Sequence, residues 1–189
     1  MFRSYKYRLY PTEDQKVRLE RTLASLCNLY NELKSEKVEK YKKDKINLTK
    51  TDLRRIALGK RRASEELKLV HSQVVQNVAD RVSVAFRNFF EKTARFPKNK
   101  KYKNYRSFIY PQSGFDFSPT PGGHKLYLSG IGYVRAFIHR PMSGKVNRLC
   151  VKRSGRMVRN ISHRKCLQTG QARLPVNIRR ENQGRRSWS

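Results

Sequence analysis

The chain opens with a period of two between hydrophobic and polar positions. Residues 2–10 alternate in the way that is typical of a half-buried strand. We expect one face of this strand to pack against a core and the other face, which is basic, to be exposed. The packed face carries Tyr5, Tyr7 and Leu9, and the exposed face carries Lys6, Arg8 and Tyr10.

The apolar positions then recur every three or four residues, which indicates amphipathic helices. Pro11 ends the strand, and Thr12 with Gln15 forms a capping box that begins a helix. The apolar stripe of this helix continues to Leu33. Beyond it the sequence is Lys-rich up to Lys45, so the helix either continues as an exposed charged stretch or frays there. The expected stripe is Leu19, Leu23, Leu26, Tyr30 and Leu33.

A second, shorter helix is predicted after Thr49, which repeats the capping signal with Asp52. Gly59 lies where a left-handed C-cap would end this helix, and residues 60–62 then form a basic turn. Residues 64–70 are predicted as a short helical segment. They precede the next helix.

The third main helix is predicted to begin at Ser72, which can act as its N-cap. Its apolar residues keep a helical period over almost twenty residues, and this stripe indicates the core of a helix bundle. We expect the polar side to face solvent. The stripe consists of Val75, Val78, Val82, Phe86 and Phe89.

Beyond residue 106 the pattern indicates short strands bounded by Pro, Gly or Ser clusters. Strands at this spacing favour a small barrel, with a bend or bulge at Gly130 and Gly132. The first strand can join the same sheet, which makes the helices an insertion and the fold class α+β. From about Arg156 no period is sustained, and most of that tail is expected to be disordered. The expected strands are 107–110, 115–118, 125–128, 133–139 and 145–153.

The charge of the chain indicates what kind of partner it binds. The 189 residues carry 44 Lys and Arg against 14 Asp and Glu, a formal net charge of +30. Such a chain repels itself unless a polyanion covers it. Nucleic acid is favoured over a membrane surface because the cations are spread over helices, loops and strands. No stretch approaches the roughly 20 apolar residues of a membrane span, and no signal-peptide core is present, so we expect a cytoplasmic protein.

The stretch between the predicted helices and strands carries the strongest chemical signal. It combines six cations with Phe96, Tyr102 and Tyr105 around Pro97. Phosphates attract such cations while unstacked bases can lie on the rings, so the pattern predicts a nucleic-acid contact. The alternative is a solvated, disordered linker. The cations are Arg95, Lys98, Lys100, Lys101, Lys103 and Arg106.

The cysteines predict neither a disulfide framework nor a zinc ribbon. Cys27, Cys150 and Cys166 form no CxxC pair, and Cys27 lies on the apolar stripe of a helix. His163 and Cys166 have ligand-like spacing, yet no second pair accompanies them. We therefore expect no cofactor in this chain.

Five segments together resemble the OrfB/TnpB family of insertion-sequence proteins, which are described as transposases and are related to the type V CRISPR effectors. In order along residues 1–155 these are KYRLYPTEDQ, LCNLYN, VVQNVADRVSVAFRNFF, RFPKNKKYKNYRSF and GIGYVRAFIHRPMSGKV. The resemblance implies a wedge-like barrel from the first and later strands, a helical recognition lobe, and a guide RNA that lies across both. The implied regions are 1–10 (first barrel strand), 11–95 (recognition lobe), 96–106 (basic aromatic loop), 107–155 (remaining barrel strands) and 156–189 (aberrant tail).

The chain departs from the family after the barrel. Family members continue with a RuvC-like nuclease domain, which uses Mg²⁺ held by three carboxylates and a structural Zn²⁺. Beyond Asp116 the only acidic residue of this chain is Glu181, and one carboxylate cannot build a two-metal site. We therefore expect no enzymatic activity from the chain on its own. Our hypothesis is that it is truncated, with the reading frame lost near Gly155.

The resemblance implies that Lys6, Arg8 and Tyr10 of the first strand contact RNA; the alternative is that they are ordinary exposed strand surface. His139, Arg140 and Lys145 match a segment of the family, and the alternative for His139 is a structural role. Helix carboxylates such as Glu65, Glu66 and Asp80 are interpreted as ordinary surface charges. The candidate nucleic-acid-binding residues are Lys6, Arg8, Tyr10, Arg95, Lys98, Lys100, Lys101, Tyr102, Lys103, Tyr105, Arg106, His139, Arg140 and Lys145.

Several functions remain compatible with the sequence. The first is a monomeric protein of the prokaryotic cell interior that binds a guide RNA from the transposon end and target DNA without cutting. The second is a regulator that binds DNA at element ends without RNA. The others are an intact enzyme with an unrecognised active site and a pseudogene product with no selected role.

Overall fold

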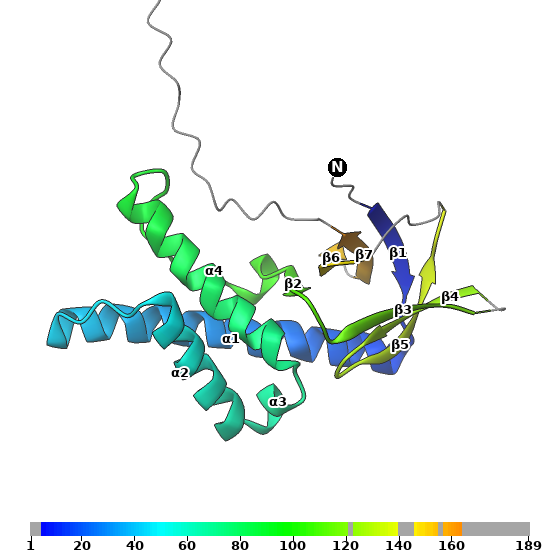
Figure 1. Ribbon diagram of the computed structural model, residues 1–189, viewed down its shortest axis with the longest axis horizontal. Helices are drawn as coiled ribbons and strands as arrows, with labels where there is room; N and C mark the ends of the chain where they lie inside the picture. The colour runs from blue at the N-terminus through cyan, green and yellow to red at the C-terminus, as the bar shows by residue number, and fades with distance from the viewer. Residues whose placement is uncertain (1–4, 121–122, 140–145, 155–156, 164–189) are drawn as a thin grey trace, which may run out of the picture.

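The computed structural model describes residues 5–120, 123–139, 146–154 and 157–163 and is an α+β structure (Figure 1). The helices gather on one side and an antiparallel sheet on the other, with the long α1 running beneath both. The four described α-helices lie between β1 and β2 in the chain. The elements are β1 (Tyr5–Tyr10), α1 (Glu13–Asp44), α2 (Lys50–Ala63), α3 (Glu65–Lys68), α4 (Ser72–Phe90), the 3-10 helix η1 (Tyr102–Asn104), β2 (Ser107–Tyr110), β3 (Phe115–Thr120), β4 (Gly123–Leu128), β5 (Gly132–Phe137), β6 (Leu149–Ser154) and β7 (Met157–His163).

The sheet has seven strands in the order β2-β6-β7-β1-β5-β4-β3, and β1 is its centre. The first half of β1, Tyr5–Tyr7, pairs with β7, whereas its second half, Arg8–Tyr10, pairs with β5. Because the two neighbours hold different halves of one strand, the sheet curls around β1. The result is a half-barrel that is open between the edge strands β2 and β3, and not the small closed barrel that the strand spacing predicts.

The core confirms the apolar stripe predicted for α1 and that of α4 as far as Phe86, whereas Phe89 is only partly buried. Every predicted stripe residue of α1 is 4% exposed or less, and Val75, Val78 and Val82 of α4 are 2% exposed or less. The helix α4 packs against α1, α2 and β2, so one hydrophobic cluster joins the helices to the sheet. Burying large aliphatic side chains in this cluster contributes roughly 1.5–3 kcal/mol for each of them.

The start of α1 is fixed to the sheet by Gln15. Its side-chain Oε1 accepts from the Thr12 backbone N–H at 3.1 Å, which completes the predicted capping box. The same amide donates from Nε2 to the Tyr133 carbonyl oxygen at 2.7 Å. At its other end α1 is continuous to Asp44, so the charged stretch beyond Leu33 extends the helix instead of fraying.

Two predicted helix boundaries are wrong. Gly59 lies inside α2, which continues through the predicted basic turn at 60–62 and ends at Ala63. The Arg61 side chain holds this last turn because it donates to the carbonyl oxygens of Val70 and Lys68 at 2.9 and 3.0 Å. The helix α4 begins with His71 as N-cap, one residue before the predicted cap.

The C-terminal limits of the sheet also differ from the prediction. Residues 157–163 form β7, which pairs with β1 and β6, whereas the sequence pattern predicts mostly disorder from about Arg156. The pairing with β1 joins distant parts of the chain, so a local pattern carries little signal for this strand. The strand β6 begins at Leu149 rather than at 145, and β5 ends at Phe137. Residues 164–189 lie outside the described residues.

The backbone requires glycine at position 130, whereas position 59 can accept a side chain. Gly130 has φ +85°, and an added Cβ would lie 2.4 Å from the Leu69 carbonyl oxygen, whereas nothing lies within 4 Å of a Cβ at Gly59. We expect Gly130→Ala to lower the free energy of unfolding by about 1–3 kcal/mol. Gly59→Ala should raise it by about 0.5–1 kcal/mol, since alanine favours the helix. Urea denaturation of both variants measures this, and equal effects would contradict it.

The fold should lose stability in mild acid through His71. Its Nδ1 accepts from the Gln73 backbone N–H at 3.4 Å, and its ring lies against the Gly114 turn. Burial, and then the positive charge of Arg61, lower the pKa of His71 below its ordinary value of 6.5. The unfolded chain therefore binds this proton more readily, so stability present above about pH 6.5 is lost as pH falls towards the folded pKa.

We expect the thermal midpoint to fall between about pH 7 and about pH 5, and to fall less in His71→Asn. Asparagine keeps a cap acceptor and cannot be protonated. The other titrating groups are the same in both proteins, so the difference between the two pH profiles isolates His71. Parallel profiles would rule out its contribution.

Candidate nucleic-acid interface

The exposed face of β1 is as the alternation predicts. Tyr7 and Leu9 are 2% exposed and point into the core, while Lys6, Arg8 and Tyr10 are exposed on the opposite face. The strand therefore presents two cations and a ring to solvent at alternate positions. These groups are accessible to a phosphate backbone or a base.

The segment 95–106 is held against α1 and is not a disordered linker. The Asn31 side chain donates to the Lys100 carbonyl oxygen at 3.0 Å and accepts from the Lys100 N–H at 2.7 Å. The Cys27 thiol donates to the same carbonyl oxygen at 3.3 Å. Upstream, the Phe96 ring packs edge-on against Phe86 and Phe89. The cations of the segment thus extend from an ordered backbone.

All six predicted cations of this segment are exposed. Lys100 also lies with its ammonium 5.8 Å from the centre of the Tyr30 ring, so its position is partly set by α1. None of the six takes part in a salt bridge with another described residue. Their charge is therefore available to a bound anion. They are Arg95, Lys98, Lys100, Lys101, Lys103 and Arg106.

Tyr105 does not offer a stacking surface, which corrects the prediction. It is 5% exposed, and burial raises the pKa of its hydroxyl. Its ring packs against Tyr30, and the Arg81 guanidinium lies 5.6 Å from the ring centre. The sequence pattern placed an aromatic residue in a basic loop, yet this ring anchors the end of the loop in the core.

Tyr102 is 39% exposed, but one face of its ring is already covered. The Arg153 guanidinium lies 4.7 Å from the ring centre and forms a 2.8 Å ion pair with Glu20 of α1. The Tyr102 hydroxyl donates to the same carboxylate. This cluster ties η1, β6 and α1 together, so Tyr102 has a structural contact in addition to its accessible edge.

A further exposed face was not recognised from the sequence, although the strands that carry it were predicted. Successive outward positions of β4 and β5 combine cations with rings, and they continue the exposed face of β1. The same period-two alternation that identified β1 could have revealed this face. The residues are Lys125 and Tyr127 on β4 and Tyr133, Arg135 and Phe137 on β5.

His139 follows β5, and its ring centre lies 5.5 Å from that of Tyr7. It therefore lies beside β1, where both a structural and a binding role are compatible with its position. Arg140 and Lys145 lie outside the described residues.

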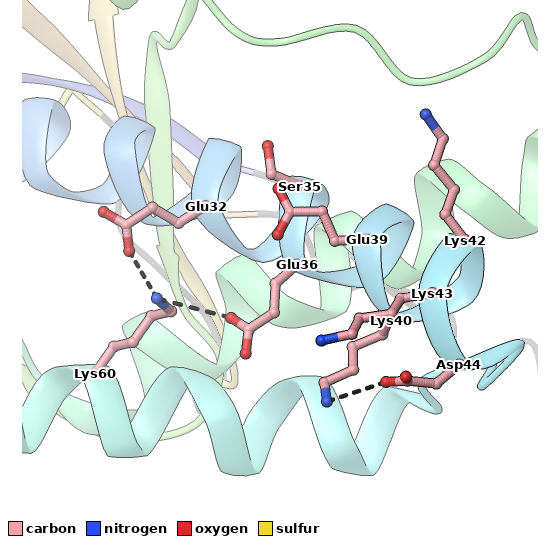
Figure 2. A pocket seen from close by; sticks show the side chains of 9 residues that line it. All are labelled: Glu32, Ser35, Glu36, Glu39, Lys40, Lys42, Lys43, Asp44 and Lys60. Carbon is pink, nitrogen blue, oxygen red and sulfur yellow. Dashed lines mark hydrogen bonds and ion pairs between the residues drawn. The ribbon is translucent and has the colours of Figure 1, made fainter.

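A groove between α1 and α2 differs from these surfaces because it contains several carboxylates (Figure 2). Lys60 lies between two of them, with its ammonium 3.1 Å from Glu32 and 3.7 Å from Glu36. Burial alone would lower the pKa of Lys60, but these carboxylates outweigh it and raise the pKa. Glu39 and Asp44 line the same groove, which makes it less suitable for a phosphate backbone than the segment 95–106.

The helix carboxylates have ordinary structural partners. Asp80 accepts two hydrogen bonds from the Arg54 guanidinium at 2.7 Å, Glu66 accepts from the Ser25 hydroxyl at 2.8 Å, and Glu65 pairs with Lys68. In the part of the chain that the structure describes, no three His, Cys, Asp or Glu side chains come together as a metal site requires. No described helix has the length and apolar character needed to span a bilayer.

Comparisons with known proteins connect this arrangement to a family. A family model described as a helix-turn-helix domain, that of the OrfB proteins, matches residues 1–45. The described part of this region consists of β1 and α1, and α2 begins only at Lys50.

A curated relative from Streptomyces pristinaespiralis, named "Putative RNA-guided DNA endonuclease", is 30% identical over 119 residues. The match covers 60% of this chain and 29% of the relative, so the chain spans only about three tenths of that protein. The matched model, this relative and the five sequence segments agree. Together they support membership of the chain in the OrfB/TnpB family of insertion-sequence proteins.

Proposed function

We propose that this chain is a nucleic-acid-binding portion of a TnpB-like RNA-guided nuclease and holds a guide RNA together with target DNA. The observation that carries the proposal is the segment 95–106, in which six exposed cations extend from a backbone that is hydrogen-bonded to α1. The name of the Streptomyces relative supports RNA and DNA as the partners in this family.

The physical argument is one of charge and preorganisation. The net charge of +30 provides a strong attraction for a polyanion. Because the segment is ordered before it binds, its cations lose less conformational entropy when they contact phosphates. In this proposal, the half-barrel and the helices correspond to the wedge-like barrel and the recognition lobe of the family.

We further propose that the 189-residue chain binds without cutting. Two-metal cleavage of a phosphodiester requires clustered carboxylates. The acidic residues of the helices instead pair with neighbouring cations and hydroxyls. Magnesium-dependent cleavage of DNA by the purified chain would overturn this part of the proposal.

The second candidate is a regulator that binds duplex DNA without RNA. The helix-turn-helix description of the family model favours it. Copurification distinguishes the two functions. A discrete RNA that matches the element's end supports the guide function, whereas nuclease-treated protein that still prefers an element-end duplex supports the regulator.

Charge removal in the segment 95–106 tests the interface directly. We expect Lys101→Gln with Lys103→Gln to weaken binding to a single-stranded oligonucleotide. The slope of log K against log salt should also fall by about 0.7 for each phosphate that the variant no longer neutralises. The matched control is Lys42→Gln with Lys43→Gln, which removes the same charge beside the groove between α1 and α2. Fluorescence anisotropy at several salt concentrations measures both. Equal decreases in the two variants would show that only net charge matters.

A further inference from the structure

The outward face of β1, β5 and β4 brings aromatic and basic side chains into register across three strands. Tyr10 lies opposite Arg135, Arg135 lies opposite Lys125, and Tyr133 lies opposite Tyr127. Two residues earlier on β1, Arg8 lies opposite Phe137. We refer to these seven residues as the sheet platform: Arg8, Tyr10, Lys125, Tyr127, Tyr133, Arg135 and Phe137.

The rings of the sheet platform are exposed and do not contribute to the packing of the core. Tyr133 and Phe137 are 58% and 59% exposed, whereas Val134 and Ala136 between them are 5% exposed or less and supply the packing of β5. Tyr10 and Tyr127 are 49% and 37% exposed. Single exposed aromatic residues are common on protein surfaces, but here the Tyr127 and Tyr133 ring centres lie 5.1 Å apart, and Tyr10 and Phe137 share the same face. Such a group of rings on one face is typical of a binding surface.

The cations of the sheet platform lie beside one another. Arg135 and Lys125 are directly opposite on adjacent strands, an arrangement that destabilises a sheet when nothing compensates the charge. Across the residues that the structure describes, no salt bridge involves Arg8, Lys125 or Arg135. A bound anion would relieve the repulsion between the cations.

We infer that the sheet platform binds a single-stranded segment of RNA, whose bases stack on the exposed rings while its phosphates pair with the cations. This inference rests on the proposed nucleic-acid binding and adds the form of the ligand and a binding site separate from the segment 95–106. Tyr133, Arg135 and Phe137 occupy alternate positions of β5, so their side chains repeat at about 7 Å along one face. A ring, a cation and a ring in this order suit a strand that alternates bases and phosphates.

The chemistry favours this ligand over the other candidates. In a duplex the bases are stacked on one another and cannot reach the rings, so duplex DNA would use only the cations. Docking of an apolar protein surface would bury Arg135 and Lys125 without partners, which is costly. RNA loops and ends commonly expose unstacked bases, and sheets with exposed aromatic residues stack two or three of them.

The test uses the full 189-residue chain and measures its dissociation constants for two RNA oligomers of equal length. Each oligomer has about eight nucleotides, a length within the site size of a single-strand-binding domain. One oligomer carries all its bases, and the other has the same sugar-phosphate backbone without bases. Tyr133→Ala and Phe137→Ala should each weaken binding of the base-bearing RNA by roughly five-fold to one hundred-fold. Neither should change binding of the abasic RNA, because the phosphate contacts remain.

Two matched variants separate stacking from other effects. Tyr133→Phe keeps the ring and should bind like the unmodified chain. Tyr41→Ala removes a similarly exposed ring, 56% exposed on α1 and away from the sheet, and should bind normally. Circular-dichroism melting checks that each variant is folded.

Each outcome decides the inference. Weaker binding confined to the base-bearing RNA and to the sheet variants supports it. Unchanged affinity of Tyr133→Ala and Phe137→Ala overturns it, while binding of RNA by the same proteins leaves the proposed function standing. Absence of binding to any RNA or DNA overturns both. Equal affinity for the matching single-stranded DNA, with the same dependence on the rings, overturns the assignment to RNA.

Discussion

The divided pairing of β1 is the interaction on which the rest of the structure depends. Its first half is bonded to β7 and its second half to β5, so this one strand joins the two parts of the sheet. Its inward residues Tyr7 and Leu9 belong to the core, and its outward residues include two cations. The curvature of the half-barrel and the position of its charged outer face therefore have the same cause.

Several of the few acidic residues are used within the structure. Glu20 pairs with Arg153, Asp80 with Arg54, and Glu32 with Lys60, and each pair links different elements. These contacts stabilise the packing of the helices on one another and on β6. Because these carboxylates are engaged there, the cations of the segment 95–106 and of the sheet platform form no salt bridge within the described part of the chain. The distribution of 14 acidic residues thus determines where the excess positive charge is accessible.

Much of the helical part could be predicted because its signals are local. The capping box at Thr12 and the periodic stripes of α1 and α4 lie within single helices, and the structure confirms them, that of α4 as far as Phe86. The end of α2 could not be predicted from Gly59, because the last turn is held by contacts from Arg61 to residues beyond the helix. Glycine permits a helix end, but such contacts decide whether the helix stops there.

The sheet and the interface were harder to predict because they depend on pairing between distant residues. The strand β7 is stabilised by two neighbours, of which β1 lies at the opposite end of the described chain, and its own pattern carries no comparable signal. Tyr105 illustrates the same limit at the interface. Its neighbours in sequence are basic or polar, yet its neighbours in space include Tyr30 and Arg81, so the ring is buried.

The Gln15 side-chain amide links the first turn of α1 to strand β5. Its oxygen closes the N-terminal cap of α1, and its nitrogen holds the backbone of Tyr133. The same amide therefore joins the backbone of β5 to the first turn of α1, which reaches the far end of the molecule. Loss of this one side chain would remove both its hydrogen bond to the cap of the helix and its hydrogen bond to the sheet.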